Sequence, residues 1–535
     1  MKHRGIVMSK KGMVSSAHTL ISASGLKILN NGGNAIDATI AMALTSSVVL
    51  PDMCGLGGDA FMLYYDAKTK TVTAINGSGP APLKASLEYF KENGYQSMPK
   101  DGILSVSVPG AVDVYFTSLE KYGTKSFAEV SQDAITLAEN GVPLSEKVIR
   151  HMHSDYAKML RFDNLRNRYL TQDLAYLPGD SIYNLEYAES LRFLAKKGRD
   201  AFYNGDLTDK IIDYSHKKAG LLEKEDFANY HCQIVKPIYT DYRDYRIYQT
   251  PPVSQGIILL EEMAILNQFD ISQYLPDSAE AIHLMVEAKK IAFFDRINYF
   301  GDPSFITNPI KEILSESYIK KMASKIDSNS CLNEKDLLIH DQSHTTSMVA
   351  IDQEGNAVSF IHSISASWGS GEIVDGTGIL LNNRASAFSL IPNHPNLIAP
   401  GKRTMHTLNT YLITDTFDLL RYVGNTPGGD NQPQWNMQVI CNLLDFKLDV
   451  QSAVEHAKWT DIQTIDEHNI QQHILTIESQ AGEEVIRKLR AIGHIVKVVE
   501  PFGCSGASQI IEVRPDGLRL GGSDPRADGA AMPQI

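Results

Sequence analysis

The sequence predicts a layered α+β protein in which helices cover β-sheets. Segments rich in β-forming residues occur in both halves of the chain, and helical patterns lie between them. The 535 residues exceed the roughly 250–300 residues at which a single hydrophobic core stops growing. We therefore expect two closely packed halves rather than one simple core.

Two helices are expected near the N-terminus. The first carries apolar residues on one face, at Leu20, Leu26 and Ile28. Asn31-Gly32-Gly33 ends it with residues that tolerate left-handed backbone, and Asn34 caps a second helix from Ala35 to Val49. This second segment contains Asp37 and is shorter than the roughly 18 uncharged residues of a membrane span. We expect it to be a buried core helix and expect no contact with a membrane.

Short β-rich segments bounded by turn residues indicate the strands. The N-terminal half contains two, Phe61–Tyr65 and Thr71–Ile75. Residues 125–330 are mostly helical in pattern. Further strands are expected at Thr346–Ile351, Ala357–Ile361, Gly378–Leu381, Leu408–Thr414, Ser508–Val513 and Leu518–Leu520.

Composition and charge exclude several classes of protein. The formal net charge is −13 and no run of Lys and Arg stands out, so nucleic acid is not an expected partner. The basic N-terminus lacks the apolar stretch of a signal peptide. The five cysteines are scattered without a CxxC pair, and no HExxH motif occurs. We therefore expect a cytoplasmic protein with reduced thiols, no metal and no cofactor.

Thr345 stands where a polar segment, NEKDLLIHDQSH (333–344), meets a strand that begins Thr345-Thr346. A threonine hydroxyl at such a boundary can attack the preceding carbonyl and so cut the chain between His344 and Thr345. The α-amino group released by the cut then activates the same hydroxyl as a nucleophile. The alternative is that Thr345 and Thr346 simply favour a strand, as β-branched residues do.

Several segments occur in the order typical of one enzyme family and span nearly the whole chain. They include GGNAIDATIAMALTSSVVLPDMCGLGGDAFMLYYD (Gly32–Asp66), TPPVSQGI (Thr250–Ile257), TTSMVAIDQEGNAVSFIHSISASWGSG (Thr345–Gly371), PGKR (Pro400–Arg403), TPGGDNQPQ (Thr426–Gln434) and GGSDPRADGAA (Gly521–Ala531). With these segments the chain resembles the γ-glutamyltranspeptidase family of N-terminal nucleophile hydrolases.

The resemblance implies a four-layer αββα sandwich that cuts itself into two fragments, residues 1–344 and 345–535. These fragments form one intertwined heterodimer, and two such heterodimers can pair. The family's nucleophile falls on Thr345 and its supporting hydroxyl on Ser363. The oxyanion hole falls on Gly428 and Gly429, whose backbone N–H groups suit a tetrahedral oxyanion. Taken alone, Pro427-Gly428-Gly429 is better interpreted as a tight turn.

The chain departs from this family where γ-glutamyl enzymes hold the amino acid end of glutamate. The family's carboxylate-binding arginine aligns with Ser78, and its serine pair aligns with His406 and Thr407. The partners of the substrate's amino group align with Ser365, Arg384 and Ala387. The loop between Asn383 and Pro400 is also short for the family.

These departures favour an anionic acyl group over a γ-glutamyl group. Arg384 stands where γ-glutamyl enzymes have a residue that binds the substrate's ammonium group. A guanidinium there favours a carboxylate, which it can bind with two hydrogen bonds. The alternative is that Arg384 forms a salt bridge within the protein. His406 either donates to substrate or packs beside a strand. The expected function is hydrolysis or transfer of the acyl part of a small amide such as oxamate. The alternatives are a glutathione hydrolase or transpeptidase, and a non-catalytic binding relative.

Overall fold

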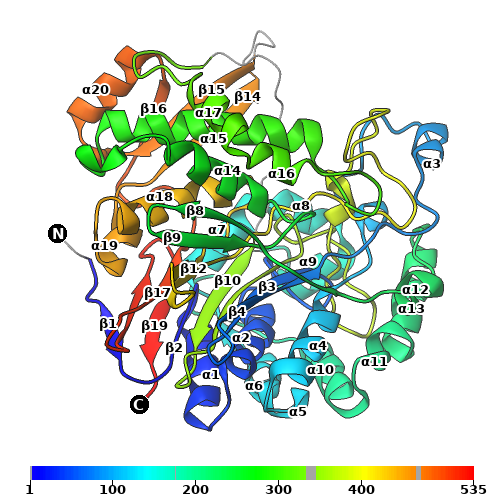
Figure 1. The fold of residues 1–535 in the computed structure, drawn as a ribbon. Coiled ribbons are helices and arrows are strands. Elements are labelled where there is room, and N and C mark those ends of the chain that lie inside the picture. Colours follow the sequence, from blue (N-terminus) through cyan, green and yellow to red (C-terminus); the bar gives the residue numbers. More distant parts are fainter. Residues whose placement is uncertain (1–2, 175, 333–344, 466–470) are drawn as a thin grey trace.

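The structure, a computed structural model, describes residues 3–174, 176–332, 345–465 and 471–535. Two seven-stranded sheets stack face to face, and helices cover both outer faces (Figure 1). This arrangement confirms the expected four-layer αββα sandwich.

The first large sheet has the order β1-β18-β17-β13-β12-β9-β8, and all of its neighbours are antiparallel. Its strands are β1 (Val7–Ser9), β8 (Ile238–Tyr242), β9 (Tyr245–Gln249), β12 (Tyr411–Asp415), β13 (Leu420–Asn425), β17 (Gln509–Val513) and β18 (Arg519–Ser523).

The second large sheet has the order β19-β2-β10-β11-β3-β4-β7 and is also antiparallel throughout. Its strands are β2 (Met13–Ser16), β3 (Asp59–Asp66), β4 (Thr71–Gly77), β7 (Gln233–Val235), β10 (Thr346–Ile351), β11 (Ala357–Ser363) and β19 (Ala530–Pro533). Smaller sheets join β14 (Trp459–Ile465), β15 (Gln471–Glu478) and β16 (Ile495–Val499), and β5 (Val142–Pro143) with β6 (Ser181–Ile182).

The helices form two separate outer layers. The layer on the second sheet contains α1 (Thr19–Asn30), α2 (Ala35–Val49), α4 (Ala111–Tyr122), α5 (Phe127–Val130), α6 (Gln132–Asn140), α7 (Glu146–Ser154), α8 (Tyr156–Arg161), α9 (Asp163–Tyr169), α10 (Leu185–Lys197), α11 (Asp200–Tyr203), α12 (Asp206–Lys217) and α13 (Lys224–Ala228). The layer on the first sheet contains α14 (Gly256–Leu266), α15 (Ala279–Tyr299), α17 (Glu316–Ala323), α18 (Gln432–Leu444), α19 (Val450–Glu455) and α20 (Glu483–Ile492). Short helices α3 (Leu87–Glu92) and α16 (Ile310–Ile313) lie outside these two cores.

Apolar side chains from the two sheets meet in a core of their own. Leu63 and Val349 of the second sheet pack with Leu412, Val423 and Ile511 of the first. Each outer face of the sandwich is buried under its helix layer. Antiparallel strands bury alternate side chains on opposite faces, so a sheet with helices on one side and a second sheet on the other has both of its faces buried.

Helix α2 confirms the expected buried core helix. Asn34 and Asp37 form a reciprocal capping box at its start, and every residue from Ala35 to Val49 is buried. Asp37 is tolerated in this environment because its carboxylate also accepts the backbone N–H groups of Thr124 and Lys125, at 2.9 and 3.0 Å.

Two expectations about the strands are wrong. Residues 233–249, expected within a helical region, form β7, β8 and β9. The expected strand Gly378–Leu381 contributes only isolated bridges, from Leu381 to Gly57 and from Leu380 to Ile373. Gly378 has a φ of +66°, and a left-handed residue bends the chain away from the extended course of a strand.

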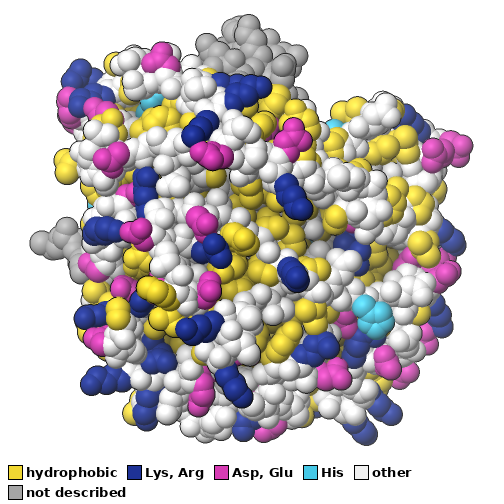
Figure 2. Space-filling view, in the orientation of Figure 1, with side chains coloured by type: hydrophobic (Ala, Val, Ile, Leu, Met, Phe, Trp, Pro, Cys, Tyr) yellow, Lys and Arg dark blue, Asp and Glu magenta, His cyan; other side chains and the backbone are white. Residues whose placement is uncertain are grey.

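Charged side chains of both signs are interspersed over the face of the molecule in Figure 2. In the described part of the chain, no helix is at once long and apolar enough to pass through a bilayer.

Candidate active site

Thr345 immediately precedes β10, in the middle of the second sheet. It is 2% exposed, and its Oγ1 has no hydrogen-bond partner among the described residues. A buried hydroxyl without a partner costs free energy. Such a group is a candidate for chemistry. His344 lies outside the described residues.

Ser363 ends the neighbouring strand, opposite the threonine. The register of β10 and β11 pairs Thr346 with His362, and one further step along an antiparallel pair sets Thr345 across from Ser363. The Ser363 hydroxyl accepts the backbone N–H of Ser365 at 2.8 Å. Ser365 itself is buried and has a φ of +82°, so the chain turns sharply just after Ser363.

Strand β13 crosses the face of β10 and β11 and leads toward Thr345. Just before β13 begins, the carbonyl of Asp418 accepts a hydrogen bond from Tyr65 Oη at 3.0 Å. Tyr65 pairs with Ala357 of β11, which pairs with Ile351 at the C-terminal end of β10. At the other end of β13, Asn425 Nδ2 lies 3.1 Å from the carbonyl of Met348 and 3.0 Å from that of Phe360. The residues that follow Asn425 therefore continue toward Thr345.

Gly428 and Gly429 form the turn that begins there. Their φ angles are +139° and +59°, a region that favours glycine. No hydrogen bond within the described residues uses the N–H of either glycine, as an oxyanion-binding pair requires. A Cβ on Gly428 would overlap the ring of Trp435.

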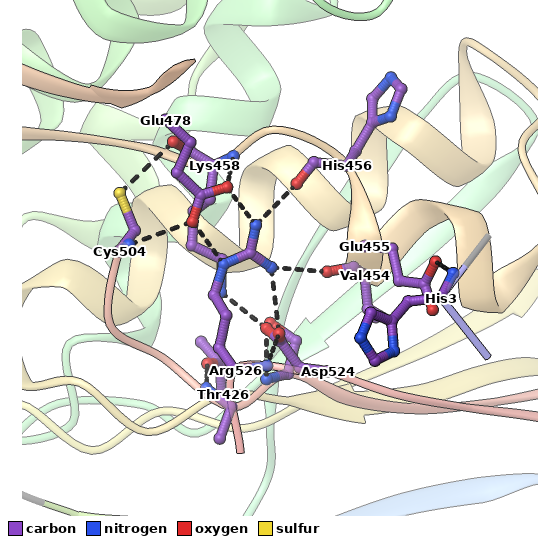
Figure 3. Close-up of polar contacts among 12 residues, drawn as sticks. His3, Thr426, Val454, Glu455, His456, Lys458, Glu478, Cys504, Asp524 and Arg526 are labelled. Atoms are coloured by element: carbon purple, nitrogen blue, oxygen red, sulfur yellow. Dashed lines mark hydrogen bonds and ion pairs between the residues drawn. The ribbon is translucent and has the colours of Figure 1, made fainter. Parts of the chain in front are cut away.

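A buried ionic network lies against the ring of Trp435. Figure 3 shows its charged members Lys458, Glu478, Asp524 and Arg526. Lys458 Nζ lies 5.2 Å from the centre of the Trp435 ring and 2.7 Å from Asp524 Oδ2. Arg526 joins the same Asp524 at 3.0 Å and also pairs with Glu478. Burial opposes ionisation, but Lys458 and Arg526 hold the pKa of Asp524 below its usual value. Asp524 and Arg526 of the segment GGSDPRADGAA therefore belong to the network behind Trp435, the ring against which Gly428 packs.

Asp59 organises the other side of the site. It pairs with Ser363 in the register of β3 and β11. One carboxylate oxygen accepts the N–H of Gly79 at 3.0 Å. The other lies 3.3 Å from Arg384 Nε and 3.2 Å from His406 Nε2. All three of these side chains are fully buried, so Arg384 belongs to an intramolecular ion pair and does not lie on the surface.

His406 is neutral at pH 7. Burial, reinforced by the charge of Arg384, lowers its pKa to about 4 although Asp59 opposes the shift. Its neighbour Thr407 offers a backbone carbonyl to Gln255 Nε2. The same amide nitrogen donates to the carbonyl of Gly429 at 2.8 Å. Gln255 therefore joins the His406 segment to the glycine turn.

The candidate site residues are buried. Thr345, Ser363, Arg384, His406 and Thr407 are all at most 3% exposed. A surface cavity of about 500 Å³ lies between residues 298–309 and 393–402. Thr345 does not line this cavity, but Lys402 does, and the next residue, Arg403, donates from Nε to the carbonyl of Ser78 at 3.0 Å.

In the structure, Asn425, Asp59 and Gln255 connect the residues that the sequence predicts in the site. None of these three residues has a predicted role in the sequence. Asp59 ends the motif GLGGD and Gln255 lies within TPPVSQGI, so both stand in segments that the sequence had marked. Nothing in the sequence indicated that they contact residues about 150 to 350 positions away.

Comparison with known proteins decides the family. The sequence profile of the family described as "Gamma-glutamyltranspeptidase" matches residues 22–534. The chain belongs to this family. Membership confirms the expected enzyme class, an amide-bond hydrolase or transferase.

Members of the family resemble the chain along its whole length. The glutathione hydrolase-like YwrD proenzyme of Bacillus subtilis is 36% identical over 98% of this chain and 99% of its own. The oxamate amidohydrolase proenzyme of Klebsiella pneumoniae is 30% identical over 98% of both chains. The crystal structure of cephalosporin acylase from Bacillus halodurans superimposes with a TM-score of 0.92 at 33% identity, over 100% of this chain and 98% of that one.

Proposed function

We propose that the chain cuts itself between His344 and Thr345 and then uses Thr345 as an N-terminal nucleophile on a small amide. The observation that carries this proposal is the buried hydroxyl of Thr345, which has no hydrogen-bond partner among the described residues and lies directly before a central strand. The names of the relatives as proenzymes support it.

The cut is an acyl shift followed by hydrolysis. Thr345 Oγ1 attacks the carbonyl carbon of residue 344, the C–N bond breaks, and the amine takes up the hydroxyl proton. Water then hydrolyses the resulting ester, which leaves a carboxylate on residue 344 and a free α-amino group on Thr345. That amine serves as the base for the same hydroxyl during turnover.

In turnover, Thr345 Oγ1 attacks the substrate carbonyl and the N–H groups of Gly428 and Gly429 receive the oxyanion. The leaving amine departs with the proton that the α-amino group had accepted. Water, or a second amine, then removes the acyl group from Thr345. Preorganised N–H donors contribute most when no solvent competes for them, and this site is buried.

The proposed fragments 1–344 and 345–535 would remain associated after the cut. Strand β10 of the smaller fragment lies between its own β11 and β2 of the larger one, and β11 pairs with β3 of the larger fragment. Separating the fragments would expose both faces of a sheet that is buried on both sides, at a cost of about 25 cal/mol per Å² of apolar surface.

We further propose that the acyl group is anionic and that Arg384, with His406, Thr407 and Ser365 around it, receives its carboxylate. The substrate ammonium of a γ-glutamyl group needs an acidic partner. Asp59 is a buried acid of this region, and both of its oxygens are already engaged, by Gly79 and by Arg384 with His406. Asp430, next to Gly429, is likewise paired, with Arg296. Ala387 offers no second acid.

A substrate screen tests the proposal against its alternatives. We expect faster turnover of oxamate and glutaryl amides than of γ-glutamyl-p-nitroanilide. Preference for the γ-glutamyl substrate would instead make the chain a glutathione hydrolase, as the names of several relatives suggest. A chain that stays uncut and turns over none of them would be a non-catalytic relative.

A further inference from the structure

Four potential metal ligands from three distant segments meet outside the proposed active site. His283 and Glu287 lie one turn apart on α15, Cys331 follows α17, and His494 follows α20. One donor atom from each lies within 4.8 Å of the others. Helices α15 and α20 pack against each other in the upper part of Figure 1.

We propose that His283, Glu287, Cys331 and His494 bind one divalent metal ion of the zinc type. Two imidazoles, a thiolate and a carboxylate form the mixed nitrogen, sulfur and oxygen set that Zn²⁺ accepts in a tetrahedron. Bond lengths of about 2.0 to 2.3 Å place the donors of such a tetrahedron about 3.3 to 3.8 Å apart. The distances here, 2.9 Å from His283 Nδ1 to His494 Nε2 and 3.9 Å from His283 Nδ1 to Glu287 Oε1, bracket that range.

The surroundings orient the first histidine as a ligand. His283 Nε2 lies 2.8 Å from the backbone carbonyl of Asp327, so this nitrogen carries the proton. The lone pair is then on Nδ1, which faces His494 and Glu287. In metal sites, a hydrogen bond from the ring nitrogen that does not bind the metal usually fixes the orientation of the imidazole. Glu287 is held as well, because its Oε2 accepts the N–H of Leu332 at 2.7 Å.

Lys290 is the group that competes with the ion. Its Nζ lies 2.7 Å from Glu287 Oε1, and both side chains are buried. The purely structural alternative is therefore a lysine–glutamate pair beside a histidine–histidine hydrogen bond. That alternative gives no role to Cys331, which is partly exposed and leaves a route for an ion.

The site would join the two proposed fragments. His283, Glu287 and Cys331 precede residue 344, whereas His494 follows residue 345. This consequence rests on the proposed self-cleavage, but metal binding itself does not. The uncut Thr345→Ala variant should bind the same ion, so failure of the cleavage proposal and failure of this one are distinguishable.

Titration of the purified full-length protein with Zn²⁺ and with Co²⁺ tests the proposal. We expect one tightly held ion per chain and, with Co²⁺, a thiolate-to-metal charge-transfer absorption. Cys331→Ser should abolish that absorption and weaken binding about tenfold or more, whereas the control Cys232→Ser should change neither. Lys290→Met should tighten binding by removing the competing cation.

Two results would overturn it. One is a wild-type protein that gives no charge-transfer absorption with Co²⁺ and retains no Zn²⁺ after dialysis. The other is equal metal content in wild type and in the folded Cys331→Ser and His494→Ala variants. The wild-type measurement needs no variant to fold, so the proposal can fail on that alone.

Discussion

Arg384 and Asp59 form an ion pair in which neither side chain reaches solvent, with Nε 3.3 Å from Oδ2. The pair lies beside Ser363, since Asp59 is the register partner of that residue. A buried charge without its partner is costly. Arg384 therefore has two possible roles, stabilising the fold through Asp59 and binding the carboxylate of the substrate. The experiments below distinguish these roles.

Removing Arg384 should affect substrates of different charge unequally. A charged hydrogen bond contributes about 1.5–3 kcal/mol, so Arg384→Gln should raise KM for an anionic amide by about 10- to 150-fold relative to a neutral amide. Steady-state kinetics on matched amides measures this ratio. Arg243→Gln, which breaks the ion pair with Asp445 outside the site, should leave the ratio unchanged. Equal losses on both substrates would make Arg384 purely structural.

The same pair should show strong coupling in stability. Asp59→Asn or Arg384→Gln alone leaves one buried charge and should lower the free energy of unfolding by about 3–5 kcal/mol. The double variant should lose less than the sum of the two, because neither charge remains. Urea unfolding of the three proteins gives the coupling energy. Additive losses would contradict a direct interaction.

Replacing Thr345 should block both self-cleavage and turnover, because one hydroxyl serves both. Thr345→Ala should run as a single band on a denaturing gel, and the smaller fragment of the wild type should begin Thr-Thr-Ser-Met-Val on N-terminal sequencing. Thr346→Ala is the matched control, since the neighbouring hydroxyl is also buried and has no partner in the described part of the chain. The chain with this substitution should still be cut. An active enzyme that remains one uncut chain would disprove the assignment.

A side chain at Gly429 should disable catalysis without unfolding the protein. Gly429→Val displaces an N–H from the oxyanion position, and loss of one such donor costs about 10²–10³ in kcat. Gly517 lies in an exposed turn at a φ of +81° with open space around it. Gly517→Val therefore imposes similar backbone strain away from the site and should keep its activity. Normal kcat in a folded, cleaved Gly429→Val protein would refute the oxyanion hole.

His406 should make the protein less stable in mild acid. Its pKa is about 4 in the folded state and 6.5 ordinarily, so the unfolded chain binds a proton first as the pH falls. Its contribution is complete above about pH 6.5 and is lost progressively toward pH 4, by about 3 kcal/mol in total. Urea unfolding at several pH values measures how the free energy of unfolding falls with pH. This fall should be shallower in His406→Gln than in wild type. The control His216→Gln, which replaces an exposed histidine, should show the same fall as wild type.

The sequence by itself determined the local elements and the order of the family segments. Asn34 and the apolar run after it fixed α2, because a cap and its helix are neighbours in the chain. Thr346–Ile351 was predicted as the strand that the structure contains. In both cases the information lies within a few residues.

Only the tertiary structure decided which distant residues share a site. Strands β7 and β9 pair with β4 and β12, which lie elsewhere in the sequence, whereas β8 and β9 form a local hairpin that was not predicted. Asp59 reaches Arg384, and His283 reaches His494, across 325 and 211 positions. Contacts between residues so far apart in the sequence depend on how whole sheets and helices pack. A local pattern of residues therefore cannot predict them.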